Sequence, residues 1–114
     1  MPHPRRGDVY WVDFDPAKGV EQRGRRPAVV IQNDHGNRVS PYTVVAALSS
    51  APLPRVYPFT VALAAGERNL PRECHVNCAQ LRTIDKARLD GFIGCLDEDR
   101  IAELDAALRF QLAL

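Results

Sequence analysis

The sequence predicts an α+β fold in which a small, strongly bent β-sheet or barrel is followed by a C-terminal helix. Six short segments between residues 7 and 96 show the alternation or the β-branched content of strands, and turn residues separate them. Beyond residue 97 apolar residues recur every three or four positions, as in an amphipathic helix. The length of 114 residues, with 46% hydrophobic and 25% charged residues, is typical of one soluble globular domain. We therefore expect a single domain over residues 1–114.

Three strands are predicted in the first half of the chain. Residues 7–14 alternate between two faces and form the first strand. After a polar loop at 15–25, the β-branched run at 28–31 is suited to a strand buried on both faces. Residues 33–37 have the composition of a turn, because Asn, Asp and Gly tolerate positive φ or bond their own backbone. The third strand is predicted at 42–48.

Three more strands are predicted in the second half. Three prolines make residues 51–58 a stiff, exposed loop that cannot pair fully. Strands at 59–63, 73–79 and 91–96 follow, and residues 84–89 are predicted to form one short helical turn.

A C-terminal helix is predicted to begin at Glu98. Asp97 is suited to cap its N-terminus, and Glu98 and Asp99 favour the positive end of the helix dipole. The apolar stripe of this helix is expected to dock on the chain's own sheet. The stripe consists of Ile101, Leu104, Leu108 and Leu112.

The formal net charge of +1 is too small to indicate a polyanion partner, but the distribution of charge is uneven. Basic side chains concentrate at Arg23, Arg25 and Arg26, whereas acidic residues are enriched in the C-terminal half. No apolar stretch approaches the length of a membrane span, and no secretory signal is visible. We expect a cytoplasmic protein that does not enter a membrane.

The three cysteines, Cys74, Cys78 and Cys95, are an odd number, which argues against a disulfide framework. Cys74 and Cys78 fall on one face of the strand predicted at 73–79. Their separation along a strand, about 13 Å, is too great for a shared metal ion or a disulfide. We interpret them as core residues and expect neither a metal site nor a cofactor. His3, His35 and His75 are interpreted as non-catalytic.

The polar residues that remain are concentrated at two places, residues 21–27 and the pair Ser49–Ser50. If the strand that starts at Arg26 and the strand that ends at Ser49 are antiparallel neighbours, both places lie at the same edge of the sheet. Such an edge is suited to binding phosphate. A solvated charged loop is the alternative that composition alone leaves open.

Spaced motifs over almost the whole chain resemble the MazF/PemK family, the ribonuclease toxins of bacterial toxin–antitoxin pairs. The motifs lie in residues 7–16, 19–30, 57–59 and 80–85. The resemblance implies an SH3-like barrel of the CcdB/MazF type, a homodimer, and a MazE-like antitoxin whose acidic C-terminal tail blocks the RNA groove. It also implies an mRNA interferase, which cleaves single-stranded RNA at short sequences without a metal ion. In this family the 2′-hydroxyl attacks the phosphate, leaving a 2′,3′-cyclic phosphate and a 5′-hydroxyl.

The resemblance carries the catalytic arginine onto Arg26 and the catalytic threonine onto Ser49, which keeps the hydroxyl but lacks the methyl group. Since arginine is effectively never deprotonated, we expect Arg26 to stabilise phosphate charge and to donate toward the leaving oxygen. Glu21 is the candidate base or a group that orients Arg26. Further RNA contacts are expected from Arg25 and Ser50 to phosphate and from Gln22 and Gln80 to base edges. Trp11 is interpreted as a core or dimer-interface residue rather than a stacking platform.

Two other functions remain open. A CcdB-like gyrase inhibitor shares the fold but acts through a C-terminal Trp-Gly-Ile, whereas this chain ends in Leu112, Ala113 and Leu114 and has its only tryptophan at position 11. A toxin or RNA-binding module of the same fold that does not cleave is the second alternative, and the serine at position 49 favours it.

Overall fold

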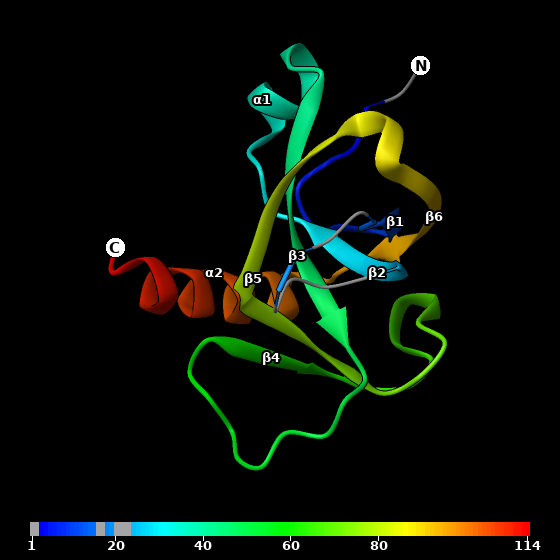
Figure 1. Ribbon diagram of the computed structural model, residues 1–114. Coiled ribbons are helices and arrows are strands. Elements are labelled where there is room, and N and C mark those ends of the chain that lie inside the picture. Colours follow the sequence, from blue (N-terminus) through cyan, green and yellow to red (C-terminus); the bar gives the residue numbers. More distant parts are fainter. Residues whose placement is uncertain (1–2, 16–17, 20–23) are drawn as a thin grey trace.

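The computed structural model describes residues 3–15, 18–19 and 24–114. Its elements, in chain order, are β1 (Asp8–Asp13), β2 (Arg25–Val30), α1 (Asp34–Val39), β3 (Tyr42–Ser49), β4 (Thr60–Leu63), η1 (Glu67–Asn69), β5 (Cys74–Asp85), η2 (Lys86–Arg88), β6 (Leu89–Cys95) and α2 (Glu98–Leu112). The described strands pair antiparallel in one sheet, in the order β4-β5-β3-β2-β1-β6. The sheet curls strongly, so that β1 and β2 lie across the long strand β3 (Figure 1). The predicted fold class, a bent antiparallel sheet with a C-terminal helix, is confirmed.

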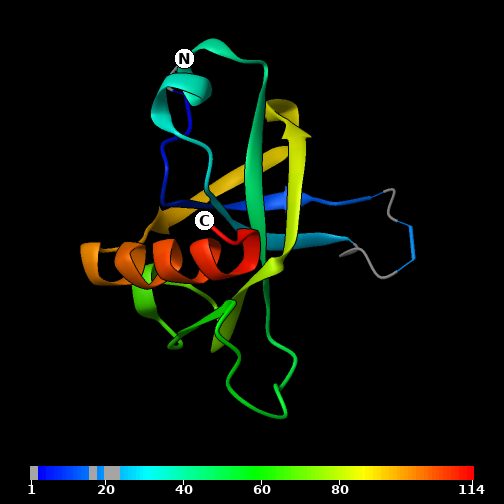
Figure 2. The ribbon, with the colours of Figure 1, turned by 90° about the vertical axis from the view of Figure 1, so that its left-hand side faces the viewer.

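The two faces of the sheet bury separate sets of side chains, because successive residues of a strand point to opposite sides. One face packs against α2, which lies across β4 and β5. Figure 2 shows α2 on this side of the sheet, whereas β1 and β2 extend away on the other side. The core of the α2 face includes Val9, Val29, Ala46, Leu48, Val76 and Leu104. The core of the opposite face comprises Val12, Phe14, Ala28, Val30, Val45, Ala47 and Ile84.

Helix α2 begins where predicted. The side chain of Asp97 accepts a hydrogen bond from the backbone N–H of Arg100 at 3.0 Å, which satisfies one of the free donors of the first turn. Leu104 is fully buried and Leu108 is nearly so. Leu112 is 51% exposed, so the expected apolar stripe ends one turn earlier than the sequence predicts.

The turn predicted at residues 33–37 is wrong, because most of this segment forms the helix α1. The side chain of Asn33 caps the helix by accepting from the N–H of Gly36 at 2.8 Å. Asn37 is fully buried, and its side chain donates to the carbonyl of Gln32 and accepts from the hydroxyl of Thr43 at 2.7 Å. The residues that suggested a turn therefore act as the cap and the buried anchor of a short helix.

Strand β5 is longer than predicted and continues to Asp85. Its alternation resumes after an irregular stretch between Asn77 and Leu81, where the pairing with β3 shifts register. Ile84 is buried as a strand residue, so the helical turn predicted at 84–89 shrinks to the three residues of η2. Strand β2 also begins earlier than predicted, with Pro27 inside it opposite Trp11.

Cys74, Cys78 and Cys95 are free thiols. Cys78 is fully buried and Cys74 is partly buried against the same core, while Cys95 is exposed. Burial raises the pKa of the Cys74 and Cys78 thiols to about 11, which leaves little reactive thiolate at neutral pH. Within the described residues, no helix combines the length and the apolar composition that a bilayer-spanning segment needs.

Docking of α2 can be tested by truncating its central leucine. Leu104→Ala should lower the free energy of unfolding by about 2–5 kcal/mol, because it removes fully buried methyl groups and leaves a cavity. Urea unfolding followed by circular dichroism measures this loss. Leu114→Ala is the matched control, because Leu114 is 86% exposed and its truncation should change stability by less than about 0.5 kcal/mol. Equal losses in the two variants would contradict the packing described.

Candidate functional site

The ends of β2 and β3 meet at one edge of the sheet. The two strands are antiparallel neighbours, with Ala28 opposite Ala47 and Val29 opposite Ala46. Continuing the same register to the strand ends sets Arg26 opposite Ser49. The strands that carry Arg26 and Ser49 are therefore antiparallel neighbours, which is the condition that the sequence analysis set for a shared sheet edge.

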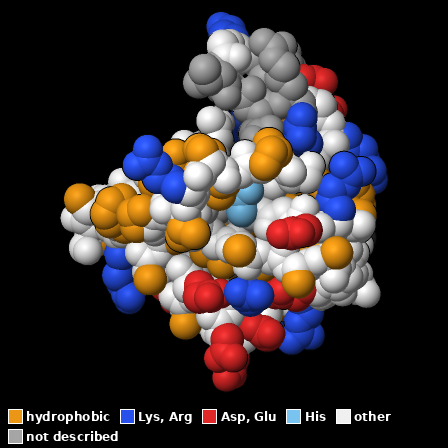
Figure 3. Space-filling model, turned by 90° about the horizontal axis from the view of Figure 1, so that it is seen from below, with side chains coloured by type: hydrophobic (Ala, Val, Ile, Leu, Met, Phe, Trp, Pro, Cys, Tyr) orange, Lys and Arg blue, Asp and Glu red, His pale blue; other side chains and the backbone are white. Residues whose placement is uncertain are grey.

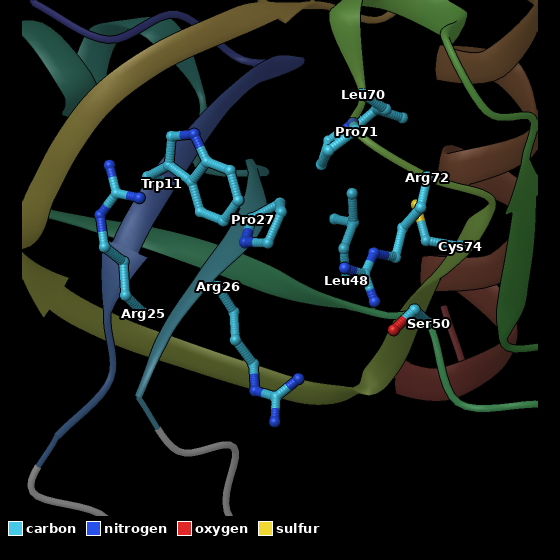
Figure 4. A pocket seen from close by; sticks show the side chains of 10 residues that line it. All are labelled: Trp11, Arg25, Arg26, Pro27, Leu48, Ser50, Leu70, Pro71, Arg72 and Cys74. Carbon is cyan, nitrogen blue, oxygen red and sulfur yellow. The ribbon is translucent and has the colours of Figure 1, made fainter.

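The alternation of strand residues divides the polar residues at this edge between two faces. Arg26 and Ser49 have the parity of Ala28 and Ala47, so they belong to the face opposite α2. Arg25 and Ser50 belong to the α2 face. Figure 4 agrees, because the side chain of Arg26 points away from Trp11 and Arg25. These four predicted site residues therefore lie on both faces of one sheet edge.

Arg25 is held against the neighbouring strands β1 and β6. Its guanidinium lies 4.5 Å from the centre of the Trp11 ring and donates to the Asp90 carboxylate at 2.8 Å. Both charged side chains are more than half exposed, so this ion pair contributes about 1 kcal/mol or less. Asp90 therefore orients Arg25 only weakly, and a phosphate can compete with Asp90 for the guanidinium.

A cavity of about 250 Å³ opens beside Trp11. Trp11 and Arg25 stand at one end and Arg72 and Ser50 at the other (Figure 4). The combination of an aromatic ring, apolar walls and guanidinium groups suits a flat, uncharged ring attached to an anion. The lining residues are Trp11, Arg25, Arg26, Pro27, Leu48, Ser50, Leu70, Pro71, Arg72 and Cys74.

A second cavity of about 490 Å³ adjoins the first, because Ser50, Arg72 and Cys74 line both. It extends over the start of the loop at 51–58 and reaches Glu73 and His75. Together the two cavities form a groove that runs past the ends of β2 and β3.

One wall of this groove, residues 70–72, is braced by α2 and β6. The Glu67 carboxylate just before the wall accepts two hydrogen bonds from the Arg100 guanidinium, at 2.8 and 3.0 Å. This pairing is the main reason why the pKa of Glu67 lies below its ordinary value. Asn69 donates to the carbonyl of Ile93 at 3.1 Å. A Cβ on Gly94 would lie 2.4 Å from the Arg68 carbonyl oxygen, so only glycine permits this close approach.

Ser49 is half-buried at the end of β3. Its Oγ accepts a hydrogen bond from the N–H of Ala51 at 3.2 Å, which fixes the oxygen and leaves the hydroxyl hydrogen to donate elsewhere. On the side away from Arg26, the residue paired with Ser49 is His75 of β5.

The structure gives less information on the other predicted site residues, Gln80, Glu21 and Gln22. Gln80 is half-buried in the irregular stretch of β5, outside the residues that line the two cavities. Glu21 and Gln22 lie outside the described residues. Among the described residues no group of three or more His, Cys, Asp or Glu side chains is arranged to hold a metal ion.

The sequence analysis missed Arg72 and the apolar wall formed by Leu70 and Pro71. Nothing in their local pattern marks them, because they reach the groove only through the contacts of Glu67 and Asn69 with distant elements. The sequence analysis interprets His75 as non-catalytic, whereas its pairing with Ser49 puts it beside the predicted site.

Comparison with known proteins gives consistent matches over nearly the whole chain. Residues 5–112 match the family described as PemK-like, MazF-like toxins of type II toxin–antitoxin systems. Endoribonuclease EndoA of Bacillus subtilis (strain 168) is 43% identical over 110 residues, which cover 96% of this chain and 95% of that protein.

Solved structures show the same architecture. MazF of Deinococcus radiodurans has a TM-score of 0.84 at 28% identity, with 100% of both chains covered. An endoribonuclease in complex with its cognate antitoxin, from a mycobacterial species, has a TM-score of 0.81 at 25% identity and covers 97% of this chain and 96% of that one.

The brace of the groove wall predicts a pH-dependent effect. Because the folded pKa of Glu67 is lowered, its carboxylate stabilises the fold above the unfolded pKa of about 4.3 and loses this effect as pH falls through the folded pKa. Glu67→Gln should therefore cost about 1–2 kcal/mol near neutral pH. The difference from wild type should shrink toward zero below about pH 4. Urea-unfolding midpoints measured across this pH range test the prediction.

Glu103→Gln is the matched control, because Glu103 is the other carboxylate on Arg100 and its side chain is 52% exposed. We expect it to cost about 0.5 kcal/mol or less. A loss at Glu67 that does not change with pH would contradict the assigned role of its charge.

Proposed function

Because this chain belongs to the family of PemK-like, MazF-like toxins of type II toxin–antitoxin systems, we propose that it is a toxin that cuts single-stranded messenger RNA. The observation that carries the proposal is the alignment of Arg26 with Ser49 at one sheet edge, beside a groove that Arg25 and Arg72 make basic. These two positions match the catalytic arginine and threonine expected from the family resemblance.

The proposed reaction is an internal transfer that needs no metal ion. The 2′-oxygen forms a bond to phosphorus and the bond to the 5′-oxygen breaks, so that a 2′,3′-cyclic phosphate and a 5′-hydroxyl result. One proton leaves the 2′-hydroxyl and one reaches the 5′-oxygen. Negative charge grows on the two remaining phosphate oxygens, and groups that stabilise this charge lower the barrier.

Arg26 and Ser49 are suited to this charge. A guanidinium stays protonated, and its two parallel N–H groups fit two phosphate oxygens. The Ser49 hydroxyl, held by the Ala51 N–H, has its hydrogen free to donate to the same phosphate. From the sequence, Glu21 is the candidate for the base that accepts the 2′ proton or for a group that orients Arg26.

RNA on either side of the cut would follow the groove. Arg25 and Ser50 are proposed to contact phosphates, and Gln22 and Gln80 to hydrogen-bond bases. The ring of Trp11 lies under Arg25 and packs against the core, so its contribution is to position that arginine and to form the cavity floor.

The proposed partners are a second copy of the chain and an antitoxin with an acidic C-terminal tail. The structure of one similar endoribonuclease has been solved in complex with its cognate antitoxin. In this chain Arg25 and Arg72 are exposed, and the positive charges proposed to bind RNA would also attract an acidic segment. Such a segment inhibits by occupying the groove. We propose the cytoplasm as the place of action.

The reaction can be tested with purified protein and a long single-stranded RNA. We expect cleavage in excess EDTA, with cyclic-phosphate ends detected by their resistance to phosphatase until acid opens the ring. Arg26→Ala should cut at least about 10²-fold more slowly because it removes a charge from the transition state. Arg26→Lys keeps the charge without the fork and should be intermediate. RNA that stays intact, or that is cut only with added magnesium, would refute the proposed chemistry and favour a binding module.

The role of Ser49 is tested by a pair of substitutions. Ser49→Ala loses the hydroxyl and should slow cleavage about 10²-fold. Ser49→Thr restores the family's residue and should keep activity within a few-fold of wild type. Initial rates on one RNA site, with the folded state checked by circular dichroism, give the comparison. Full activity of the alanine variant would remove the hydroxyl from the mechanism.

A further inference from the structure

Three polar residues form a row across three neighbouring strands on the face opposite α2. Arg26 of β2 lies opposite Ser49 of β3 when the register of the two strands is continued, and Ser49 is paired with His75 of β5. Residues directly opposite one another on antiparallel strands project to the same side of the sheet. Adjacent strands are about 4.8 Å apart, so Arg26 and His75 flank Ser49 with their backbones about 10 Å from each other.

His75 lacks the features of a structural core histidine. Its neighbours Cys74 and Val76 point into the aliphatic core under α2, whereas His75 faces the other way. The residue is 8% exposed and lines the cavity of about 490 Å³. The ring of His75 forms no hydrogen bond to another described residue. Among the described residues, however, every fully buried side-chain nitrogen or oxygen has a hydrogen-bond partner. The ring nitrogens therefore reach the accessible surface of the cavity.

Figure 3 views the molecule from the side of β4, which pairs with β5. Histidine atoms reach the surface there, between hydrophobic side chains and charged ones. A histidine side chain is therefore accessible to a ligand from this side of the molecule.

The surroundings keep the imidazole neutral. Burial lowers the pKa of His75 below its ordinary value of 6.5, and no charged neighbour offsets this effect. Among the described residues, Arg72 and Glu73 from the segment that enters β5 line the same cavity as His75. Arg26 of β2 and Arg82 of β5 lie on the same face of the sheet as His75. The residues paired with His75, Ser49 of β3 and Ala62 of β4, carry no ionisable group. A neutral imidazole accepts a proton at neutral pH.

The proposed cleavage needs a group that accepts the 2′ proton and a group that stabilises charge, and the two must lie on different sides of the same phosphate. The attacking 2′-oxygen and the leaving 5′-oxygen lie roughly in line through phosphorus, so the group that takes the 2′ proton must lie opposite the group that assists departure. A phosphate bound at Ser49, in the middle of the row, has Arg26 on one side and His75 on the other.

Building on the proposed function, we propose that His75 is a catalytic residue and the general base of this ribonuclease. The imidazole takes the proton of the 2′-hydroxyl as the 2′-oxygen bonds to phosphorus. The bond to the 5′-oxygen breaks, and that oxygen takes a proton from water hydrogen-bonded to Arg26. The imidazolium then returns its proton to solvent. Glu21 is left to orient Arg26 or to contact RNA, and the proposal departs from the sequence-based interpretation of His75 as non-catalytic.

The experiment measures single-turnover cleavage of a short RNA with one cut site, in EDTA, between about pH 4 and 8, a range that extends well below the ordinary pKa of histidine. The wild-type rate should rise with pH to a plateau as His75 loses its proton. His75→Gln should be slower by about 10²-fold or more and should lose the acidic limb. His35→Gln is the matched control, because His35 is exposed in α1 and should leave rate and profile unchanged. Glu21→Gln should keep the limb.

A second substrate separates a base from an acid or a structural role. Sulfur in place of the 5′-bridging oxygen leaves without protonation, so it rescues the loss of an acid but not of a base. His75→Gln should remain slow on it. The same variant should bind the RNA with a 2′-deoxy cut site as tightly as wild type and keep its unfolding midpoint.

Each outcome decides one claim. His75→Gln within about three-fold of wild type, or rescue by the sulfur substrate, overturns the role of His75 and leaves the ribonuclease intact. If His75→Gln does not fold, the wild-type profile decides, because a rate independent of pH over this range overturns the proposal. Intact RNA with wild-type protein overturns the proposed function itself.

Discussion

The antiparallel register between β2 and β3 is the constraint on which the site depends. The hydrogen bonds that set Ala28 opposite Ala47 also decide which side chain at the strand ends faces which way. A slip by one residue would expose Val29 and Ala46, both fully buried, and would turn Arg26 toward Trp11. The hydrophobic core thus fixes the register, and the register in turn brings Arg26, Ser49 and His75 into one row.

The same alternation gives two adjacent arginines different tasks. Arg25 lies on the face where α2 and Trp11 pack, and its exposed pairing with Asp90 is weak enough to exchange for a phosphate. Arg26 lies on the other face with the hydroxyl and the imidazole. The proposed binding surface and the proposed catalytic row therefore share one sheet edge and lie on opposite faces of it.

Much of the fold could be predicted from periodicity, whereas the site required long-range contacts. Alternation in β1 and β3 and the cap at Asp97 are local signals, and the structure agrees with them. Asn33 and Asn37 led to the incorrect prediction of a turn, because the side chains that favour turns also cap and anchor a short helix. Arg72 and His75 could not be assigned, since the bracing of the groove wall and the pairing of β5 with β3 join residues far apart in the chain. The resemblance pointed to Arg26 and Ser49, but periodicity alone would have left them as a charged loop and a strand end.

The brace between Glu67 and Arg100 also sets an order of events during synthesis. The strands that carry Arg26 and Ser49 leave the ribosome well before α2, whereas the groove wall at residues 70–72 gains its support only when Gly94 and Arg100 have followed. A nascent chain that has not yet reached Gly94 therefore carries Arg26 and Ser49 without these supports of the groove wall. Helix α2 supplies the support of the proposed binding surface, so the wall at residues 70–72 is braced only after Arg100 has been synthesised.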